Sequence, residues 1–213
     1  MLANIFDAFV KESPLSVMMR GVMEYVFRAE RLDDLFERHA KLQYTRELLF
    51  SDVVGLLSLV VCRIHRSVNA TYKARATELN VKRAAFYQKL NGIETSVSAA
   101  LVRETAEELG ELIQQMGGQH VPLLPGYQVR ILDGNALAAT EHRLKVLRSV
   151  GAAPLPGKSL VVLDPELGLA VDIFPCEDGH AQERRLFGHV LATVASGQLW
   201  IADRNMCTLE MLS

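Results

Sequence analysis

The first half of the chain repeats apolar residues with the period of an α-helix. Between residues 1 and 116 they recur at three- and four-residue intervals, and the breaks carry residues that cap helices. Ser13-Pro14 predicts a helix opening on an N-cap and a first-turn proline, and Ser51-Asp52 predicts the start of another. A helix over residues 96–116 should end at Gly117-Gly118. Its predicted apolar face consists of Val97, Leu101, Leu109, Leu112 and Met116.

After residue 120 the pattern changes to short β-branched runs between turn residues. Candidate strands cover residues 128–132, 159–163, 168–174 and 198–202, and a helix over 181–195 lies between the last two. Short links favour an antiparallel meander for the first three strands, while a helical crossover allows the fourth to lie parallel to a neighbour. We therefore expect an α+β protein with an all-helical region over 1–120 and a strand-rich domain over 121–213.

Two of the predicted strands run directly into an aspartate. Residues 129–132 precede Asp133-Gly134, and residues 199–202 precede Asp203. An Asp-Gly pair is also a common turn, and Asp203 equally suits the N-cap of a short helix over 206–212. If the fourth strand lies parallel beside the first, the two carboxylates meet at one sheet edge. This order of strands and helix is how an RNase H fold builds a site for two Mg²⁺ or Mn²⁺ ions about 4 Å apart.

Charge is unevenly distributed, although the formal net charge is only −2. Residues 63–89 contain seven basic residues and one acidic residue, a local balance of +6, which indicates either a phosphate-binding surface or a set of solvated helix faces. Near 70–91 the pattern predicts a helix, a turn at Asn80 and a second helix, as in a helix-turn-helix or a plain αα-hairpin. Phe86 and Leu90 are expected in the core. The residues offered to DNA would be Lys82, Arg83, Tyr87, Gln88 and Lys89.

Several strings, spread over nearly the whole chain, resemble transposases of the insertion-sequence-four type. They are QYTRELLFS at 43–51, DGN at 133–135, TEHRL at 140–144, LPGKSL at 155–160, EDGHAQER at 177–184 and DRN at 203–205. The resemblance implies a DDE transposase with an RNase H-like catalytic domain, in which Asp133 is the first catalytic acid and Asp203 the second. Met206 stands where the family has an aromatic residue, a substitution that keeps the position apolar.

The third acid of such transposases lies on a later helix with a Tyr, Arg, Glu and Lys signature, which the sequence up to Ser213 does not contain. Glu210, seven residues after Asp203, does not stand where the family has its catalytic Glu. The expected core is therefore incomplete. Two functions stay open: a metal-dependent enzyme that cuts and joins DNA when complete, or a truncated and catalytically inactive DNA-binding remnant.

The resemblance also implies partners and further contacts. The expected partner is double-stranded DNA, both transposon ends and target, with a homodimer in the synaptic complex and Mg²⁺ or Mn²⁺ as cofactor. Arg143, Lys145 and Arg148 suit either a DNA-facing stripe near Asp133 or an ordinary exposed helix face. Asp178 and His180 begin a predicted helix, where Asp178 suits an N-cap or a functional role, and 183–185 suits a solvated face.

Nothing in the sequence predicts a membrane segment. The longest apolar stretch, residues 53–62, has ten residues, too few to cross about 30 Å of hydrocarbon, so a buried helix is expected. The N-terminus lacks the features of a secretory signal, and the three cysteines are widely scattered rather than paired. The predicted location is the cytoplasm, in association with bacterial DNA.

Overall fold

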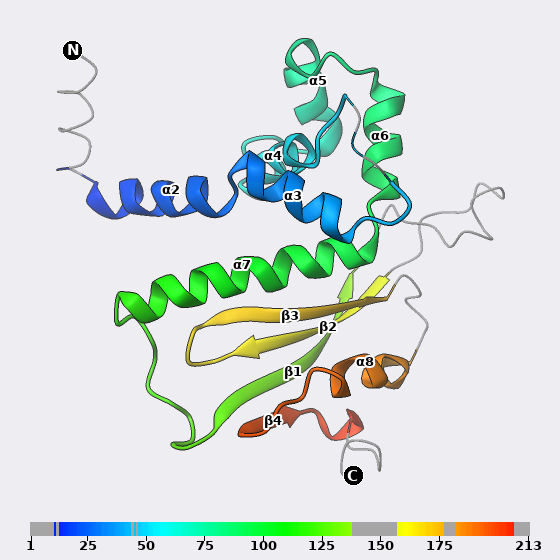
Figure 1. Ribbon diagram of the computed structural model, residues 1–213. Coiled ribbons are helices and arrows are strands. Elements are labelled where there is room, and N and C mark those ends of the chain that lie inside the picture. Colours follow the sequence, from blue (N-terminus) through cyan, green and yellow to red (C-terminus); the bar gives the residue numbers. More distant parts are fainter. Residues whose placement is uncertain are drawn as a thin grey trace. The chain divides into compact units, whose positions relative to one another are not determined.

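The computed structural model describes residues 11, 13–43, 45, 47–137, 157–176 and 182–206 (Figure 1). These residues form helices and a four-stranded mixed sheet, which confirms the α+β class. Contacts divide the chain into two units, Met1–Leu90 and Asn91–Ser213. None of the described helices is both long and apolar enough to cross a bilayer.

The first unit contains the helices that the periodicity predicted. They are α2 (Pro14–Val26), α3 (Ala29–His39), α4 (Phe50–Val61), α5 (Val68–Leu79) and α6 (Arg83–Gly92). As predicted, Ser13 is the N-cap residue of α2 and Pro14 opens the helix, although the Ser13 hydroxyl donates to Ser16 Oγ at 2.8 Å instead of accepting from a backbone N–H. Asp52 caps α4, accepting a hydrogen bond from Leu49 N at 3.1 Å.

The core of this unit lies where α3 and α4 meet. The rings of Phe36 and Phe50 stack with centroids 5.3 Å apart, and Val53 is fully buried beside them. Asp33 accepts hydrogen bonds from the backbone N–H and the hydroxyl of Ser51, at 2.9 and 2.8 Å. The ten-residue apolar stretch thus forms a helix with one buried side, although Val61 at its end is 80% exposed.

The second unit consists of α7 (Thr95–Gln115), the strands, and the short helices between and after the last two strands. The strands are β1 (Gln128–Leu137), β2 (Gly157–Asp164), β3 (Leu169–Cys176) and β4 (Gln198–Ala202), in the sheet order β3-β2-β1-β4. The first three pair antiparallel and β4 pairs parallel with β1, which confirms the predicted meander and crossover. The change from helix to strand falls near residue 120, but the contacts of α7 assign it to this second unit.

The predicted apolar face of α7 is largely wrong. Of its five residues only Val97 is fully buried, and Met116 is 60% exposed. The other buried residues are small: Ala99, Ala100, Ala106 and Gly110. A Cβ built on Gly110 would lie 3.2 Å from Leu167 Cδ1, so the helix packs closely on the Leu167 side chain at this glycine. Hydrophobic periodicity gives weight to large residues and therefore misses a face that packs through small ones.

Both helical layers of this unit cover the same face of the sheet. On that face Arg103 Nε of α7 donates to Asp172 Oδ1 of β3 at 2.6 Å. Asp172 is the register partner of Val162 on β2, so the two side chains share one face of the sheet. Val162 belongs to the core that also contains Phe187 and Val190 of the short helix after β3. The buried core there comprises Leu132, Leu160, Val162, Phe174, Phe187, Val190 and Met206. The opposite face includes Leu163 and Ile201, which are 37% and 44% exposed.

Two element boundaries differ from the prediction. The strand predicted over 128–132 continues to Leu137, because its pairing with β2 extends to the pair Leu137–Gly157. The helix predicted over 181–195 is shorter: a 3₁₀ turn, η2 (Glu183–Leu186), leads into α8 (Phe187–Leu191). The helix predicted over 206–212 lies mostly outside the described residues, where only the 3₁₀ turn η3 (Arg204–Met206) precedes it.

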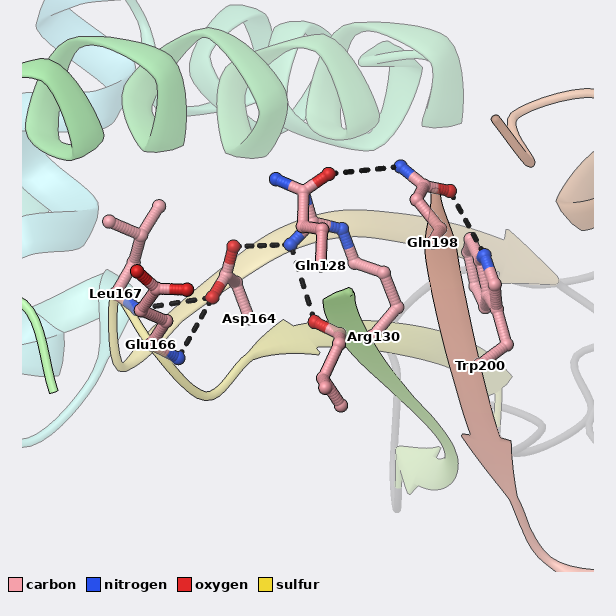
Figure 2. Close-up of polar contacts among 8 residues, drawn as sticks. Gln128, Arg130, Asp164, Glu166, Leu167, Gln198 and Trp200 are labelled. Atoms are coloured by element: carbon pink, nitrogen blue, oxygen red, sulfur yellow. Dashed lines mark hydrogen bonds and ion pairs between the residues drawn. The ribbon is translucent and has the colours of Figure 1, made fainter. Parts of the chain in front are cut away.

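A buried ion pair joins the two central antiparallel strands. Arg130 of β1 reaches the carboxylate of Asp164 at the end of β2 (Figure 2). The same carboxylate accepts hydrogen bonds from the backbone N–H groups of Glu166 and Leu167, at 2.9 and 3.1 Å, and so closes the turn into β3. Every charge in this cluster is therefore paired, which makes its burial tolerable.

A chain of side-chain hydrogen bonds links β1 to its parallel neighbour at the same end. Gln198 Nε2 donates to Gln128 Oε1 at 3.3 Å, and Gln198 Oε1 accepts from Trp200 Nε1 at 3.0 Å (Figure 2). Gln128 and Gln198 are also the first register pair of the two strands. This contact therefore favours the observed register over one slipped along β4.

Replacing Arg130 with Met should lower the free energy of unfolding by about 3–5 kcal/mol, because it leaves Asp164 buried without its cation. Arg103→Met is the matched control. The Arg103 side chain is 43% exposed, so loss of its ion pair with Asp172 should cost less than about 1 kcal/mol. Urea unfolding of both variants measures the difference. Equal losses would show that the Arg130 pair has no special role.

Candidate functional site

The two predicted catalytic aspartates occupy equivalent positions on neighbouring parallel strands. The last register pair of β1 and β4 is Leu132–Ala202, and the next residue on each strand is Asp133 and Asp203. Asp203 directly follows β4, as predicted. Asp133 does not end its strand but lies within β1, because β1 continues along β2 after its pairing with β4 stops.

Asp133 belongs to what we call the open face of the sheet, the face opposite α7 and α8. Leu132 lies in the core under α8, and successive side chains of a strand alternate between faces, so Asp133 points to the other side. Its side chain is exposed, and Oδ1 accepts a hydrogen bond from Gly134 N at 2.8 Å. Asp203 is exposed as well. Two exposed carboxylates on neighbouring strands offer the oxygen ligands that Mg²⁺ and Mn²⁺ prefer.

Glu183 approaches the same segment from the helix-covered face. A Cβ built on Gly134 would lie 2.6 Å from Glu183 Oε1, so the carboxylate occupies the space that a side chain at position 134 would fill. The prediction that Glu183 belongs to a solvated face is therefore wrong, whereas Arg184 and Arg185 beside it are exposed. A sequence gives no sign of this contact, because it depends on where η2 crosses the sheet.

The alternation of faces explains why three acids do not converge here. Gly134 and Asp133 are adjacent in β1 and face opposite sides, so Glu183 and Asp133 approach the strand from opposite faces. No group of three or more His, Cys, Asp or Glu side chains suited to a metal ion occurs among the residues that the structure describes. The site in view is thus a pair of aspartates open to solvent.

The second candidate site is the α5–α6 pair in the first unit. Asn80 adopts a left-handed conformation, with φ of 50°, and ends α5. The Tyr72 hydroxyl donates to Val81 O at 2.7 Å, and the Tyr72 ring stacks on Phe86 with centroids 5.4 Å apart. Two helices joined by three residues and locked by a shared aromatic contact form the predicted hairpin, with Phe86 fully buried as expected.

The five predicted DNA contacts on this hairpin differ in exposure. Lys82, Arg83 and Gln88 are exposed. Tyr87 is half-buried, edge-on to Phe86, with the Arg83 guanidinium 5.6 Å from its ring centroid. Lys82, Arg83 and Gln88 are therefore the most accessible of the five.

Lys89 is placed differently from the prediction. Its Nζ lies 3.7 Å from the centroid of the Phe36 ring and is buried without a hydrogen-bond partner. Burial lowers the pKa of the Lys89 ammonium from its ordinary value, and the carboxylate of Asp33 acts in the opposite direction. This amine stabilises the α3–α6 packing through a cation–π contact rather than extending toward a phosphate.

Several predicted residues lie outside the described part of the chain. They are Arg143, Lys145, Arg148, Asp178, His180 and Glu210. Met206 is described and is buried in the core beneath the sheet, in keeping with an apolar residue at that position.

A cleft of about 410 Å³ opens between α7 and the other end of β1 and β4, near Arg130 and Trp200. Its two arginines, Arg103 and Arg130, are both ion-paired, and Glu107 and Glu111 also line it. The cleft therefore presents little unpaired positive charge for a nucleic-acid phosphate, and it lies away from the aspartate pair.

We predict that the aspartate pair binds Mn²⁺ weakly and that Asp133→Asn or Asp203→Asn lowers the affinity on the order of tenfold, equivalent to about 1.4 kcal/mol. Isothermal titration calorimetry of the whole chain measures this. Glu183→Gln is the matched control, since Glu183 approaches β1 from the other face and its loss should leave the affinity unchanged. If all three substitutions weaken binding alike, the ion sits on the helix-covered side and the open-face site is excluded.

Comparison with known proteins adds no relative to these observations. No family model matches the chain, and neither a curated protein nor a solved structure does. The features that bear on function are therefore the aspartate pair and the helical hairpin.

Proposed function

We propose that this chain is the DNA-binding part and an incomplete RNase H-like core of a DDE transposase. The observation that carries the proposal is the parallel register of β1 and β4, which makes Asp133 and Asp203 neighbours. Adjacent strands are about 4.8 Å apart, a spacing that two metal ions about 4 Å apart can bridge. The antiparallel meander followed by a helical crossover to a parallel strand supports the same fold.

In the proposed enzyme the two aspartates would hold Mg²⁺ or Mn²⁺, which would activate the attacking oxygen and stabilise the leaving oxygen of a phosphodiester. Asp133 and Asp203 offer the hard carboxylate oxygens that Mg²⁺ prefers, and their exposure leaves room for the waters that this ion retains. The third ligand of such a site would have to come from a segment covering the open face beside Asp133. Glu183 does not meet that requirement, because it approaches from the other face.

The proposed substrate is double-stranded DNA, bound mainly through the α5–α6 hairpin. The window from Arg63 to Lys89 has a local charge of +6, and its exposed cations include Lys82 and Arg83 at the start of α6. Neutralising DNA phosphates releases counterions, so such a surface binds with a steep dependence on salt. We also propose that a homodimer holds two DNA ends together, and this part rests on the family resemblance alone.

A second candidate is a DNA-binding remnant without catalysis, which would share the α5–α6 hairpin and the neighbouring aspartates. Translating the DNA that follows the codon for Ser213 separates the two candidates. A Tyr, Arg, Glu and Lys signature in frame there restores the enzyme.

Replacing both Lys82 and Arg83 with Ala should reduce the salt dependence of DNA binding. Loss of two phosphate contacts lowers the slope of log K against log salt by about 1.8 in magnitude. Lys89→Met is the control, because the Lys89 amine packs on Phe36 and a methionine can keep contact with that ring. Fluorescence anisotropy at several salt concentrations gives both slopes. An unchanged slope in the double variant means that this surface is only solvated.

The 213-residue chain should fail to cleave or join DNA at a normal rate, even with Mg²⁺ or Mn²⁺. Two aspartates leave the second ion poorly held, and a displacement of about 1 Å can cost about 100-fold in rate. The assay uses DNA carrying the ends of its element, with Asp133→Ala run in parallel. Strong cleavage that Asp133→Ala abolishes would prove that another acid of this chain completes the site.

A further inference from the structure

The outward face of α6 has the chemistry of a surface that reads bases. Positions 84 and 88 are one helical turn apart and both exposed, as is Ala85 beside them. The inward side of the helix carries Phe86, which is fully buried, and Lys89, whose amine covers the Phe36 ring. Ala84 and Gln88 therefore form the middle of the exposed face.

This face is held rigidly enough to present a fixed pattern. The stacked Tyr72 and Phe86 rings and the hydrogen bond from Tyr72 to Val81 O join α6 to α5. Near its other end, Gln43 Nε2 donates to Lys89 O at 3.1 Å. Contacts at both ends of the helix limit its rotation, so the direction of Gln88 is set by the packing.

We infer that α6 lies in the major groove of DNA and that Gln88 reads an adenine there, so that the chain prefers an A·T pair at one position. A glutamine amide pairs with the N6 and N7 atoms of adenine, and an alanine methyl contacts the thymine methyl group. The small side chains of Ala84 and Ala85 allow the helix axis to approach the base edges. Lys82 and Arg83, exposed at the start of the helix, would contact the flanking phosphates.

The inference rests on the proposed DNA-binding function and deepens it by separating two kinds of contact. Lys82 and Arg83 supply affinity for any sequence, because phosphates carry no base identity. Gln88 has no charge and releases no counterions, so the role inferred for it is sequence preference rather than salt-dependent affinity. The exposed cations Lys82 and Arg83 beside this face favour a polyanion over a neutral protein surface as its partner.

The test is selection of binding sites by the full chain from a duplex library with random sequence. The wild-type chain should enrich sites with a fixed A·T pair. Gln88→Ala should lower the preference at that pair about tenfold or more, while leaving the salt slope unchanged. Gln88→Glu should shift the preference toward a C·G pair, because a carboxylate accepts from cytosine N4. Gln114→Ala removes an exposed glutamine of α7 and should change nothing.

The outcomes separate this inference from the function beneath it. Absence of DNA binding at low salt overturns the proposed function and this inference together. Binding without sequence preference, or with a preference that Gln88→Ala leaves intact, overturns the inference alone. Because Gln88 is exposed, both variants should unfold at the wild-type urea concentration, so a changed preference will not reflect misfolding.

Discussion

The parallel pairing of β1 with β4 is the constraint on which the second unit depends. β1 is the only strand of the described sheet with a parallel partner on one side and an antiparallel one on the other. A parallel partner requires a crossover, which η2 and α8 supply while covering one face of the sheet. The same pairing makes Asp133 and Asp203 neighbours although seventy positions separate them in sequence. The Gln128–Gln198 contact at the first register pair keeps that relation.

The two faces of this sheet have different consequences for chemistry. One face is filled by a core that runs from Leu132 to Phe187, and Arg130 can be buried there because Asp164 compensates its charge. The other face leaves Leu163 and Ile201 partly exposed and carries Asp133. The metal site that we propose would therefore lie on the face that carries Asp133, where water could complete the coordination of the ions.

In the helical unit, some basic side chains are buried in the packing and others are exposed to solvent. Lys89 and Lys82 look alike in sequence, but the amine of Lys89 is desolvated against Phe36, while Lys82 is exposed. The aromatic contact between Tyr72 and Phe86 determines which residues of α6 face outward. The positive charge that is accessible to the proposed DNA partner is therefore smaller than the charge count of residues 63–89 indicates.

The sequence alone determined the α+β class, the strand order and the hairpin. Hydrophobic periodicity, turn residues and the crossover rule can be read along the chain without knowledge of tertiary contacts. It also indicated Asp133 and Asp203, since each follows a run of apolar residues. Only the tertiary structure decided which side of α7 is buried, how far β1 extends, and where Lys89 and Glu183 lie. Those features depend on contacts between segments that are far apart in the chain. Small residues of α7 pack on the sheet, and pairing with β2 extends β1. The Phe36 ring contacts the Lys89 amine, and Gly134 leaves space for the Glu183 carboxylate.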